Sequence, residues 1–371
     1  MSDQVLKIGK IGIGDLALHC GGVLRGAEIA YASRGELSQD RSNVVLVTHG
    51  FTSSHLFIGR AGPSASEGSW ARLVGPGAAI DTDRFHVVSS NMLGSSYGST
   101  APASIDPATG RRYGPRFPAL AMPDIVGAQH AMLEAMGITR LVAVVGPSYG
   151  GFQALAWGIE YPDFARGLSL SVSGLRPPAG ITPDELRARF VADHNWNGGD
   201  YYETGGMVES MARLREETLR QYGVDVFLRP RFPEPAALDA EIVRQARQWA
   251  EEFDANSLIA LAAAVQGYDA EPQLHRIRAK VQLVLSRTDT LFPPSTAPAT
   301  MRAFRNAGVD AEYFALDSDF GHHAAGARLA EMGAGPATVH RRAAGQGLTL
   351  LVLKDRPERG SEPAAYCRSR R

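Results

Sequence analysis

Runs of apolar residues alternate with amphipathic stretches along most of this chain. The runs are short and rich in Val, Leu and Ile, which is typical of strands in a buried sheet; they lie at 43–48, 85–90, 141–145, 167–172, 280–286 and 310–316. Two further strands, 16–20 and 27–32, are expected ahead of them, joined by a glycine-containing turn. An amphipathic helix is predicted at 123–135, and a helix-forming run that ends before Pro162 follows residue 148. This order predicts an α/β fold with an open, mostly parallel sheet, helices on both faces and a site at the carboxyl ends of the strands.

The pattern changes between the strands at 167–172 and 280–286, where helical segments replace strands. Thr182-Pro-Asp-Glu185 is a helix start, because threonine can cap the first turn, proline suits the first helical position and glutamate can complete a capping box. Further helical segments follow, including 236–265. Helices inserted between strands predict a cap that excludes water from the site and shapes the substrate pocket. An ordinary crossover with additional helices is the alternative.

These patterns divide the chain into four parts. Residues 1–174 and 271–335 are expected to form the two parts of the core, and residues 175–270 the cap. The last part, 336–371, lacks the amphipathic helix that should close the sheet, and its final 31 residues carry eight Lys or Arg against three Asp or Glu. We expect a solvated, poorly ordered basic tail. An arm for an anionic partner and a frame error in the gene are the alternatives.

Composition narrows the classes of function. The 371 residues are 44% hydrophobic, which is ample for a core, and a formal charge of −1 offers no field to attract nucleic acid or a membrane surface. The first residues contain no apolar signal core, and no apolar run approaches the length of a transmembrane helix. Cys20 and Cys367 give neither a disulfide framework nor a metal-ligand spacing. We expect a cytoplasmic protein that binds small molecules and no metal, nucleic acid or membrane; a homodimer is left open.

One glycine-flanked serine carries the strongest functional signal. Ser148 lies in Gly146-Pro-Ser-Tyr-Gly150, between the Val-rich strand 141–145 and a helix. Strand, sharp turn and helix in this order predict the nucleophile elbow of an α/β-hydrolase, where glycines allow the two backbones to approach closely. A second copy of the pattern centres on Ser96, but the two prolines that follow it prevent a helix. We therefore expect Ser148 to be the nucleophile and Ser96 to be a loop residue.

Two later residues complete a Ser…Asp…His order that this fold is known to use. Asp289 and His322 each follow a predicted strand, so their loops can reach the elbow. A serine hydroxyl needs a neighbouring imidazole to take its proton, and His322 is the candidate for this general base. Asp289 would hold the imidazole in the required tautomer and stabilise its charged form.

Other residues compete for the roles of acid and base. His323 is adjacent to His322 and also able to titrate near neutrality, and His340 follows Asp289 as well. Asp317 and Asp319 lie near His322 but on the wrong side of it for the usual order. Loop histidines and aspartates of this kind are more often capping or solvated residues.

The loop after the strand 43–48 is expected to help bind a negatively charged oxygen. In an α/β-hydrolase this loop supplies one backbone N–H of the oxyanion hole, and the residue after the nucleophile supplies the other. The loop begins His49-Gly50-Phe51, so Phe51 and Tyr149 are the predicted donors through their main chains. The alternative interpretation is that His49-Gly50 only ends a strand.

Several stretches together resemble the homoserine O-acetyltransferase family of α/β-hydrolases. They cover about residues 40 to 325 in register and comprise 91–102, 106–118, the elbow with Gln153–Trp157, 253–257 and 289–294. The resemblance implies that an acyl group passes from a coenzyme A thioester, a co-substrate and not a bound cofactor, to the serine and then to an acceptor hydroxyl. It also implies that Ser148, Asp289 and His322 form the triad.

The departures from that family concern the acceptor. The family usually has an aspartate after the catalytic histidine, expected to meet the acceptor's amino group, and here that position is His323. Glu252 and Leu258 replace an arginine and a tyrosine around Phe253-Asp-Ala-Asn-Ser257. The family's Thr-Tyr segment in the cap is replaced by Met211-Ala-Arg-Leu-Arg215. Candidate substrate or cap contacts are therefore His323, Glu252, Arg213 and Arg215.

Three functions remain open from the sequence. The first is an O-acyltransferase whose small hydroxyl acceptor is not homoserine. The second is an ester hydrolase of the carboxylesterase type, in which water accepts the acyl group from the same triad. The third is a non-catalytic binding protein on the same fold, against which the intact Ser, Asp and His argue.

Overall fold

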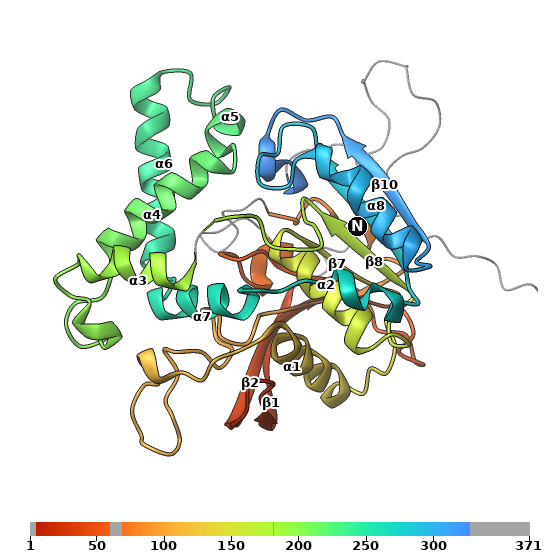
Figure 1. Cartoon of the computed structure of the whole chain (residues 1–371), viewed down its shortest axis with the longest axis horizontal. Coiled ribbons are helices and arrows are strands. Elements are labelled where there is room, and N and C mark those ends of the chain that lie inside the picture. The colour runs from red at the N-terminus through yellow and green to blue at the C-terminus, as the bar shows by residue number, and fades with distance from the viewer. Residues whose placement is uncertain (1–4, 60–68, 181, 327–371) are drawn as a thin grey trace, which may run out of the picture.

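An eight-stranded, mostly parallel sheet forms the centre of the protein (Figure 1). The structure is a computed structural model, and it describes residues 5–59, 69–180 and 182–326. The strand order is β1-β2-β6-β3-β7-β8-β9-β10; the first two strands are antiparallel to their neighbours and the other six are parallel. The strands are β1 (Lys7–Ala17), β2 (Val23–Arg34), β3 (Val44–Thr48), β6 (His86–Ser90), β7 (Ala143–Pro147), β8 (Gly167–Ser171), β9 (Lys280–Ser286) and β10 (Ala311–Leu316). The predicted sheet is confirmed; a separate parallel pair joins β4 (Val74–Gly75) and β5 (Ile80–Asp81).

The first predicted strand is displaced. Residues 18–20 belong to the turn after β1, where Gly21 N–H donates to the Leu18 carbonyl at 2.9 Å. Gly21 and Gly22 both have positive φ angles, which end the strand, because such a conformation suits glycine. The glycine-rich stretch before Leu18 forms β1 through pairing with β2, so the strand begins and ends earlier than the predicted 16–20.

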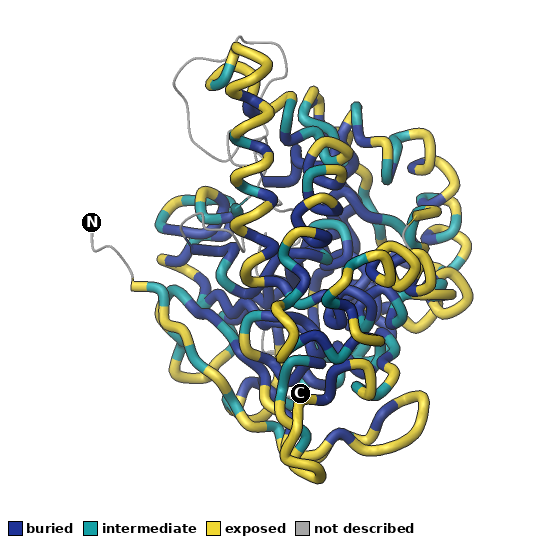
Figure 2. Tube along the Cα trace, turned by 90° about the vertical axis from the view of Figure 1, so that its left-hand side faces the viewer, coloured by how far each residue is buried: buried dark blue, intermediate teal, exposed yellow. Residues whose placement is uncertain are grey.

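Apolar side chains cover both faces of the sheet, and Figure 2 shows the buried residues concentrated in the middle of the molecule. Alternate residues of each central strand point to opposite faces, so Val144 packs with one cluster and Val145 with another. The first face is covered by α1 (Met122–Ala135), α2 (Tyr149–Glu160) and α8 (Ala297–Asn306). The second is covered, within the described residues, by the 3₁₀ helix η1 (His55–Ile58) and by residues 70–85.

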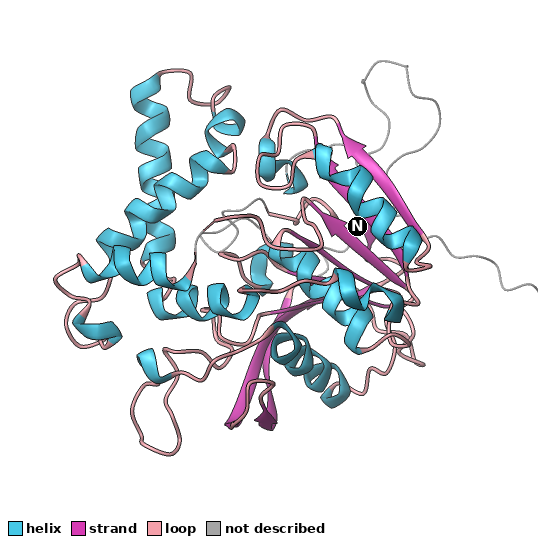
Figure 3. Ribbon diagram, in the orientation of Figure 1, coloured by secondary structure: helices cyan, strands magenta, loops and turns pink. Residues whose placement is uncertain are grey.

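Helices fill the segment between β8 and β9, and we call this insertion the cap (Figure 3). They are α3 (Pro183–Val191), α4 (Val208–Gln221), α5 (Val224–Leu228), α6 (Pro235–Ala250) and α7 (Ala255–Val265). Helices α4, α5 and α6 have a small apolar cluster of their own, which includes Leu219 and Ile242. The predicted start of α3 is confirmed: Thr182 Oγ1 accepts from Glu185 N–H at 3.2 Å, and Glu185 Oε2 accepts from Thr182 N–H at 2.8 Å.

The predicted helical segment 236–265 is two helices instead of one. Asp254 separates them, because its Oδ2 accepts a hydrogen bond from Ser257 N–H at 2.9 Å and so caps the first turn of α7. The phenolic hydroxyl of Tyr201 also donates to Asp254 Oδ1, at 2.5 Å. This carboxylate therefore joins α7 to the loop before α4.

The basic tail 336–371, with His340 and Cys367, lies beyond the described residues. Cys20 is an exposed free thiol. Among the helices that the structure describes, none is both long and apolar enough to cross a membrane.

Candidate active site

Ser148 occupies a strained turn between β7 and α2. Its φ of 53° and ψ of −120° lie outside the regions that serine ordinarily adopts. Its amide donates to the Ser171 carbonyl on β8 at 2.8 Å, and its carbonyl accepts from Gly151 N–H at 2.8 Å. The hydroxyl of Ser173 donates to the same carbonyl at 2.8 Å. The backbone is therefore fixed on both sides of the serine, as the predicted elbow requires.

The two glycines of the elbow lie against the end of β3. A Cβ atom on Gly146 would lie 2.2 Å from Thr48 Oγ1 and 2.6 Å from the Thr48 carbonyl oxygen. A Cβ atom on Gly150 would lie 2.6 Å from the same carbonyl oxygen. Thr48 Oγ1 also donates to the Gly150 carbonyl at 2.9 Å, so Thr48 cannot easily move away. Both positions require glycine because of backbone contact.

Replacing Gly146 with alanine is expected to destabilise the protein by about 3 kcal/mol or more, because the new methyl group would overlap backbone and not only a flexible side chain. Soluble yield and melting temperature measure this effect. Gly127→Ala is a matched control, because its Cβ would meet only the Tyr161 hydroxyl, at 3.7 Å. Gly127 lies inside α1, so alanine there is expected to raise stability by about 0.5–1 kcal/mol. Equal melting temperatures for the two variants would contradict this account of the elbow.

Ser96 lies in a loop, as its sequence context indicates. Its hydroxyl oxygen accepts a hydrogen bond from Asp254 N–H at 2.9 Å, next to the start of α7. Its carbonyl oxygen accepts from Asn91 Nδ2 at 2.6 Å. The serine of the second glycine-flanked pattern thus holds the cap against the core.

Asp289 and His322 form a buried hydrogen-bonded pair. His322 Nδ1 lies 2.9 Å from Asp289 Oδ2, and the two side chains are almost completely buried. Asp289 Oδ1 accepts from Leu291 N–H at 2.9 Å and from Phe292 N–H at 3.3 Å, which fixes the carboxylate plane. A carboxylate can only accept, so His322 carries a proton on Nδ1 and leaves Nε2 available as a base.

A cavity of about 150 Å³ lies at Ser148. Its walls come from the elbow, the loop after β3, the cap and the loop that follows Asp289, and none of the described residues that line it is charged. The His322 ring packs against two of these wall residues, with centroids 5.0 Å from Tyr222 and 5.8 Å from Phe292. Ser148 thus lines the cavity, and His322 packs on two of the residues that form its wall. Sequence reasoning missed these two aromatic residues.

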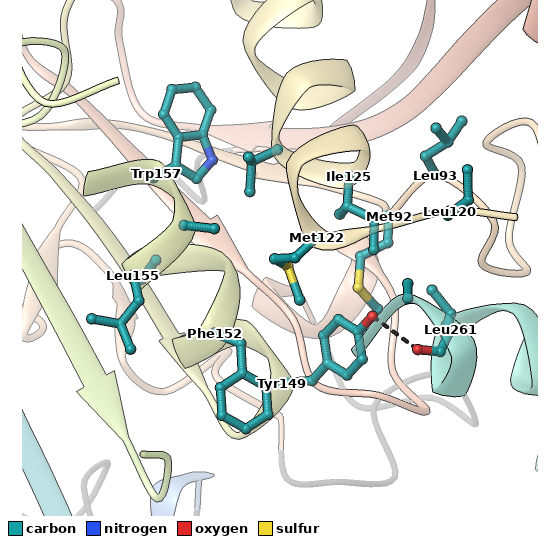
Figure 4. Close-up of a cluster of buried hydrophobic side chains, with 14 of the residues drawn as sticks. Met92, Leu93, Leu120, Met122, Ile125, Tyr149, Phe152, Leu155, Trp157 and Leu261 are labelled. Atoms are coloured by element: carbon teal, nitrogen blue, oxygen red, sulfur yellow. Dashed lines mark hydrogen bonds between the residues drawn. The ribbon is translucent and has the colours of Figure 1, made fainter. Parts of the chain in front are cut away.

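The first turns of α2, which follow Ser148, also pack against helix α7 of the cap. Figure 4 shows Tyr149 and Phe152 of α2 among apolar side chains from α1, α7 and the loop after β6. The Tyr149 hydroxyl donates to the Leu261 carbonyl on α7 at 3.1 Å. Burial raises the pKa of Tyr149 far above its ordinary value, so the phenol stays protonated and keeps this bond.

The predicted oxyanion donors lie side by side at the cavity. The rings of Phe51 and Tyr149 stack with centroids 5.7 Å apart and an interplanar angle of 11°, and both residues line the cavity. The Tyr149 amide is the first of α2, so no carbonyl within the helix can accept from it. Both residues line the same cavity as Ser148, and the role of their amides in the oxyanion hole stays a prediction.

His49 bonds to the peptide group between Gly50 and Phe51, a role that sequence reasoning missed. His49 Nε2 accepts from Met92 N–H at 3.2 Å, so the ring proton lies on Nδ1 and is donated to the Gly50 carbonyl at 2.9 Å. That carbonyl belongs to the same peptide plane as Phe51 N–H. Burial lowers the pKa of His49 to about 3, so the ring is neutral at physiological pH.

The four candidate contact residues separate into two pairs. Arg213 and Glu252 are exposed, and Arg213 Nη2 donates to Ser210 Oγ at 2.9 Å. His323 and Arg215 are buried. Burial, His322 and Arg215 together lower the pKa of His323 to about 4, so its ring is neutral near pH 7. Within the described residues its Nδ1 has no hydrogen-bond partner.

The competing acids lie elsewhere. Asp317 Oδ1 accepts from Arg287 Nε at 2.7 Å, and Asp319 accepts from the same guanidinium. All three side chains are more than half exposed, whereas the Asp289 side chain is completely buried. The structure thus favours Asp289 as the partner of His322.

Comparisons with known proteins agree with this arrangement. The family model for the alpha/beta hydrolase fold matches residues 43–325. A homoserine O-acetyltransferase of Haemophilus influenzae is 34% identical over 332 residues, which cover 83% of this chain and 91% of that protein. One from Symbiobacterium thermophilum is 36% identical over 334 residues, covering 83% and 87%.

Solved structures similar to this chain include a homoserine O-acetyltransferase and an esterase. The crystal structure of esterase E22 has a TM-score of 0.77 at 25% identity and covers 89% of this chain and 98% of its own. Homoserine O-acetyltransferase from Bacillus anthracis has a TM-score of 0.77 at 25% identity and covers 88% and 95%. Three homoserine O-acetyltransferases and one esterase are thus similar to this chain over most of its length.

Proposed function

Because this chain belongs to the homoserine O-acetyltransferase family of α/β-hydrolases, we propose that it transfers an acyl group through Ser148 to a small hydroxyl acceptor other than homoserine. Acyl transfer or ester hydrolysis on a serine-hydrolase fold is the activity that the relatives support. The observation that supports an acceptor other than homoserine is the buried, neutral ring of His323, the residue after His322.

The first half of the reaction would acylate the serine. Ser148 Oγ attacks the acyl carbonyl of the donor while His322 Nε2 takes the hydroxyl proton. The carbonyl oxygen becomes negatively charged and is bound by the N–H groups of Phe51 and Tyr149. When the carbonyl re-forms, the leaving thiolate or alkoxide departs with the proton from His322. Asp289 stabilises the imidazolium that exists between these two steps.

The second half would repeat these steps with the acceptor. The acceptor hydroxyl gives its proton to His322 Nε2 and its oxygen attacks the acyl-serine. The same amides bind the second oxyanion, and its collapse returns the proton to Ser148 Oγ. No residue besides the triad and the two amides has to change its bonding.

A coenzyme A thioester is our proposed donor, and the shape of the site supports an elongated donor. The cavity at Ser148 shares walls with a larger groove of about 490 Å³; the shared residues are Pro177, Pro178, Ala179, Gly180, Ala262 and Val265. The groove extends to the half-exposed Arg176, which is paired with Asp269 at 3.0 Å. These apolar shared walls suit the uncharged arm of a thioester.

The acceptor proposal depends on charge. An ammonium group moved from water into this cavity needs a carboxylate close by, or its desolvation is uncompensated. None of the described residues that line the cavity is a carboxylate, the ring of the buried His323 is neutral, and Asp289 already accepts from His322, Leu291 and Phe292. Glu252 lies exposed in the turn after α6. Neutral or acidic hydroxyl compounds are therefore the expected acceptors.

Thiol release from acetyl-CoA tests this proposal with L-homoserine and a panel of neutral and acidic alcohols. We expect homoserine to be at least about a hundredfold poorer in kcat/KM than the best alcohol, as a missing partner for a buried charge predicts. His323→Asp is expected to raise the homoserine rate, whereas the isosteric but uncharged His323→Asn is not. Efficient acetylation of homoserine by the wild-type protein would show that another group binds the ammonium.

Ester hydrolysis is the second candidate, favoured by the uncharged cavity and by the similarity to esterase E22. Water would then take the place of the acceptor in the second half of the reaction. Thiol or p-nitrophenol release without any alcohol separates the two functions. Fast, steady release favours a hydrolase; a burst followed by slow turnover that an alcohol accelerates favours a transferase.

A further inference from the structure

Helix α4 of the cap contacts both loops that the proposed mechanism uses. Arg215, Thr218 and Tyr222 follow each other at helical spacing, and the last two line the cavity at Ser148. At one end, Arg215 Nη1 donates to Thr52 Oγ1 at 2.7 Å. At the other end, the Tyr222 carbonyl accepts from His323 N–H at 2.9 Å, and its ring packs on His322. One side of α4 therefore joins the loop after β3 to the loop that contains His322 and His323.

Helix α6 adds a second contact to the same threonine. Trp249 Nε1 donates to the Thr52 carbonyl at 2.9 Å, across 197 positions of sequence. The indole is 1% exposed, stacks on Phe253 with centroids 4.9 Å apart, and lies under the Arg215 guanidinium at 5.0 Å. The cap thus holds the backbone and the side chain of Thr52 through two different helices.

Thr52 directly follows Phe51, whose amide is a proposed oxyanion donor. We propose that Trp249 and Arg215 are positioning residues, through which the cap sets the orientation of the oxyanion loop. This inference rests on the proposed acyl transfer or hydrolysis through Ser148. Oxyanion binding needs its N–H donors within about 2.7–3.1 Å of the developing charge. A small rotation of this loop would therefore weaken binding of the transition state far more than binding of the substrate.

The contacts allow a variant that removes one bond and little else. Trp249→Phe keeps an aromatic ring to stack on Phe253 and to face Arg215, but it removes the indole N–H that holds the Thr52 carbonyl. Thr52→Val removes the hydroxyl that accepts from Arg215 and keeps the shape, whereas Thr52→Ser keeps the hydroxyl. If Trp249→Phe fails to fold, the threonine pair still tests the proposal.

Three measurements on the full chain test it: the acylation rate with p-nitrophenyl acetate, the inhibition constant of a trifluoromethyl ketone, and the melting temperature. The ketone adds Ser148 Oγ to its carbonyl and so places a negative oxygen in the oxyanion hole. For Trp249→Phe and Thr52→Val we expect acylation to fall about 10- to 100-fold and ketone affinity to fall in parallel, with KM changed less than about threefold. Thr52→Ser, which keeps the hydroxyl, should acylate at close to the wild-type rate.

Other outcomes overturn the proposal. Folded Trp249→Phe and Thr52→Val proteins that bind the ketone as the wild type does would show that the cap contacts serve stability alone. A loss of activity that only follows the fraction of unfolded protein would show the same. If the transferase proposal is wrong, the wild-type protein will hydrolyse the ester but acylate no alcohol. The variants can then still be compared by ester hydrolysis, so the role of Trp249 and Arg215 is tested all the same. A wild-type protein that neither reacts with the ester nor binds the ketone contradicts both.

Discussion

Replacing Ser148 with alanine is expected to abolish covalent labelling by a fluorophosphonate probe and to lower acyl transfer by about 10⁴-fold or more. The reason is that Ser148 occupies the strained turn between β7 and α2 and lines the cavity. Alanine keeps the backbone bonds to Ser171 and Gly151, so the fold should survive. In-gel fluorescence of the purified protein and thiol release from acetyl-CoA measure the two effects.

Ser96→Ala is the matched control, because this serine occurs in the same sequence pattern. It should label as the wild type does. The Asp254 amide loses its acceptor, so a stability loss of about 1 kcal/mol is expected, visible as a modest drop in melting temperature. Labelling that survives Ser148→Ala and disappears in Ser96→Ala would reverse the assignment of the nucleophile.

The second large effect is expected for Asp289→Asn, which should lower the rate of acyl transfer by about 10³- to 10⁴-fold while the fold is retained. Leu291 N–H and Phe292 N–H both donate to one oxygen of Asp289, so the asparagine oxygen will keep that position. Its NH₂ group must then face His322 Nδ1. That nitrogen becomes an acceptor, the ring proton moves to Nε2, and the histidine can no longer take a proton from Ser148.

Asp317→Asn and Asp319→Asn are controls for this prediction. Both acids lie on the surface with Arg287, so neither change should alter the rate more than about twofold. Acyl-transfer rates and melting temperatures of the three variants separate loss of function from loss of fold. A large effect at Asp317 or Asp319, with none at Asp289, would identify a different partner for His322.

Local constraints made the elbow and the sheet predictable from sequence. A serine between two glycines, a Val-rich strand and a helix has few other ways to fold, and the structure places Ser148 in that turn. The pairing of Asp289 with His322 was predictable because both follow strands whose carboxyl ends lie on one edge. The start of α3 was predictable for the same local reason, since its cap is formed within four residues.

Features that depend on distant contacts were not predictable. Arg213 and Arg215 look equivalent in sequence, yet they are two positions apart on α4 and therefore face solvent and core respectively. The break between α6 and α7 depends partly on Tyr201, which bonds to Asp254 from the loop before α4. Trp249 finds Thr52 across 197 positions, and no local pattern indicates such a pair.

The position of the cap in the chain also affects how the protein folds. Strands β8 and β9 are neighbours in the sheet, but the whole cap lies between them, and the bond from Ser169 to Gln282 spans 113 positions. Closing so long a loop adds little to the equilibrium free energy, since each doubling of loop length costs only about 0.6 kcal/mol. It slows folding much more, because non-local pairing must wait for the loop to close. Until then β8 presents an unpaired edge, and a newly made chain can associate through it with other chains.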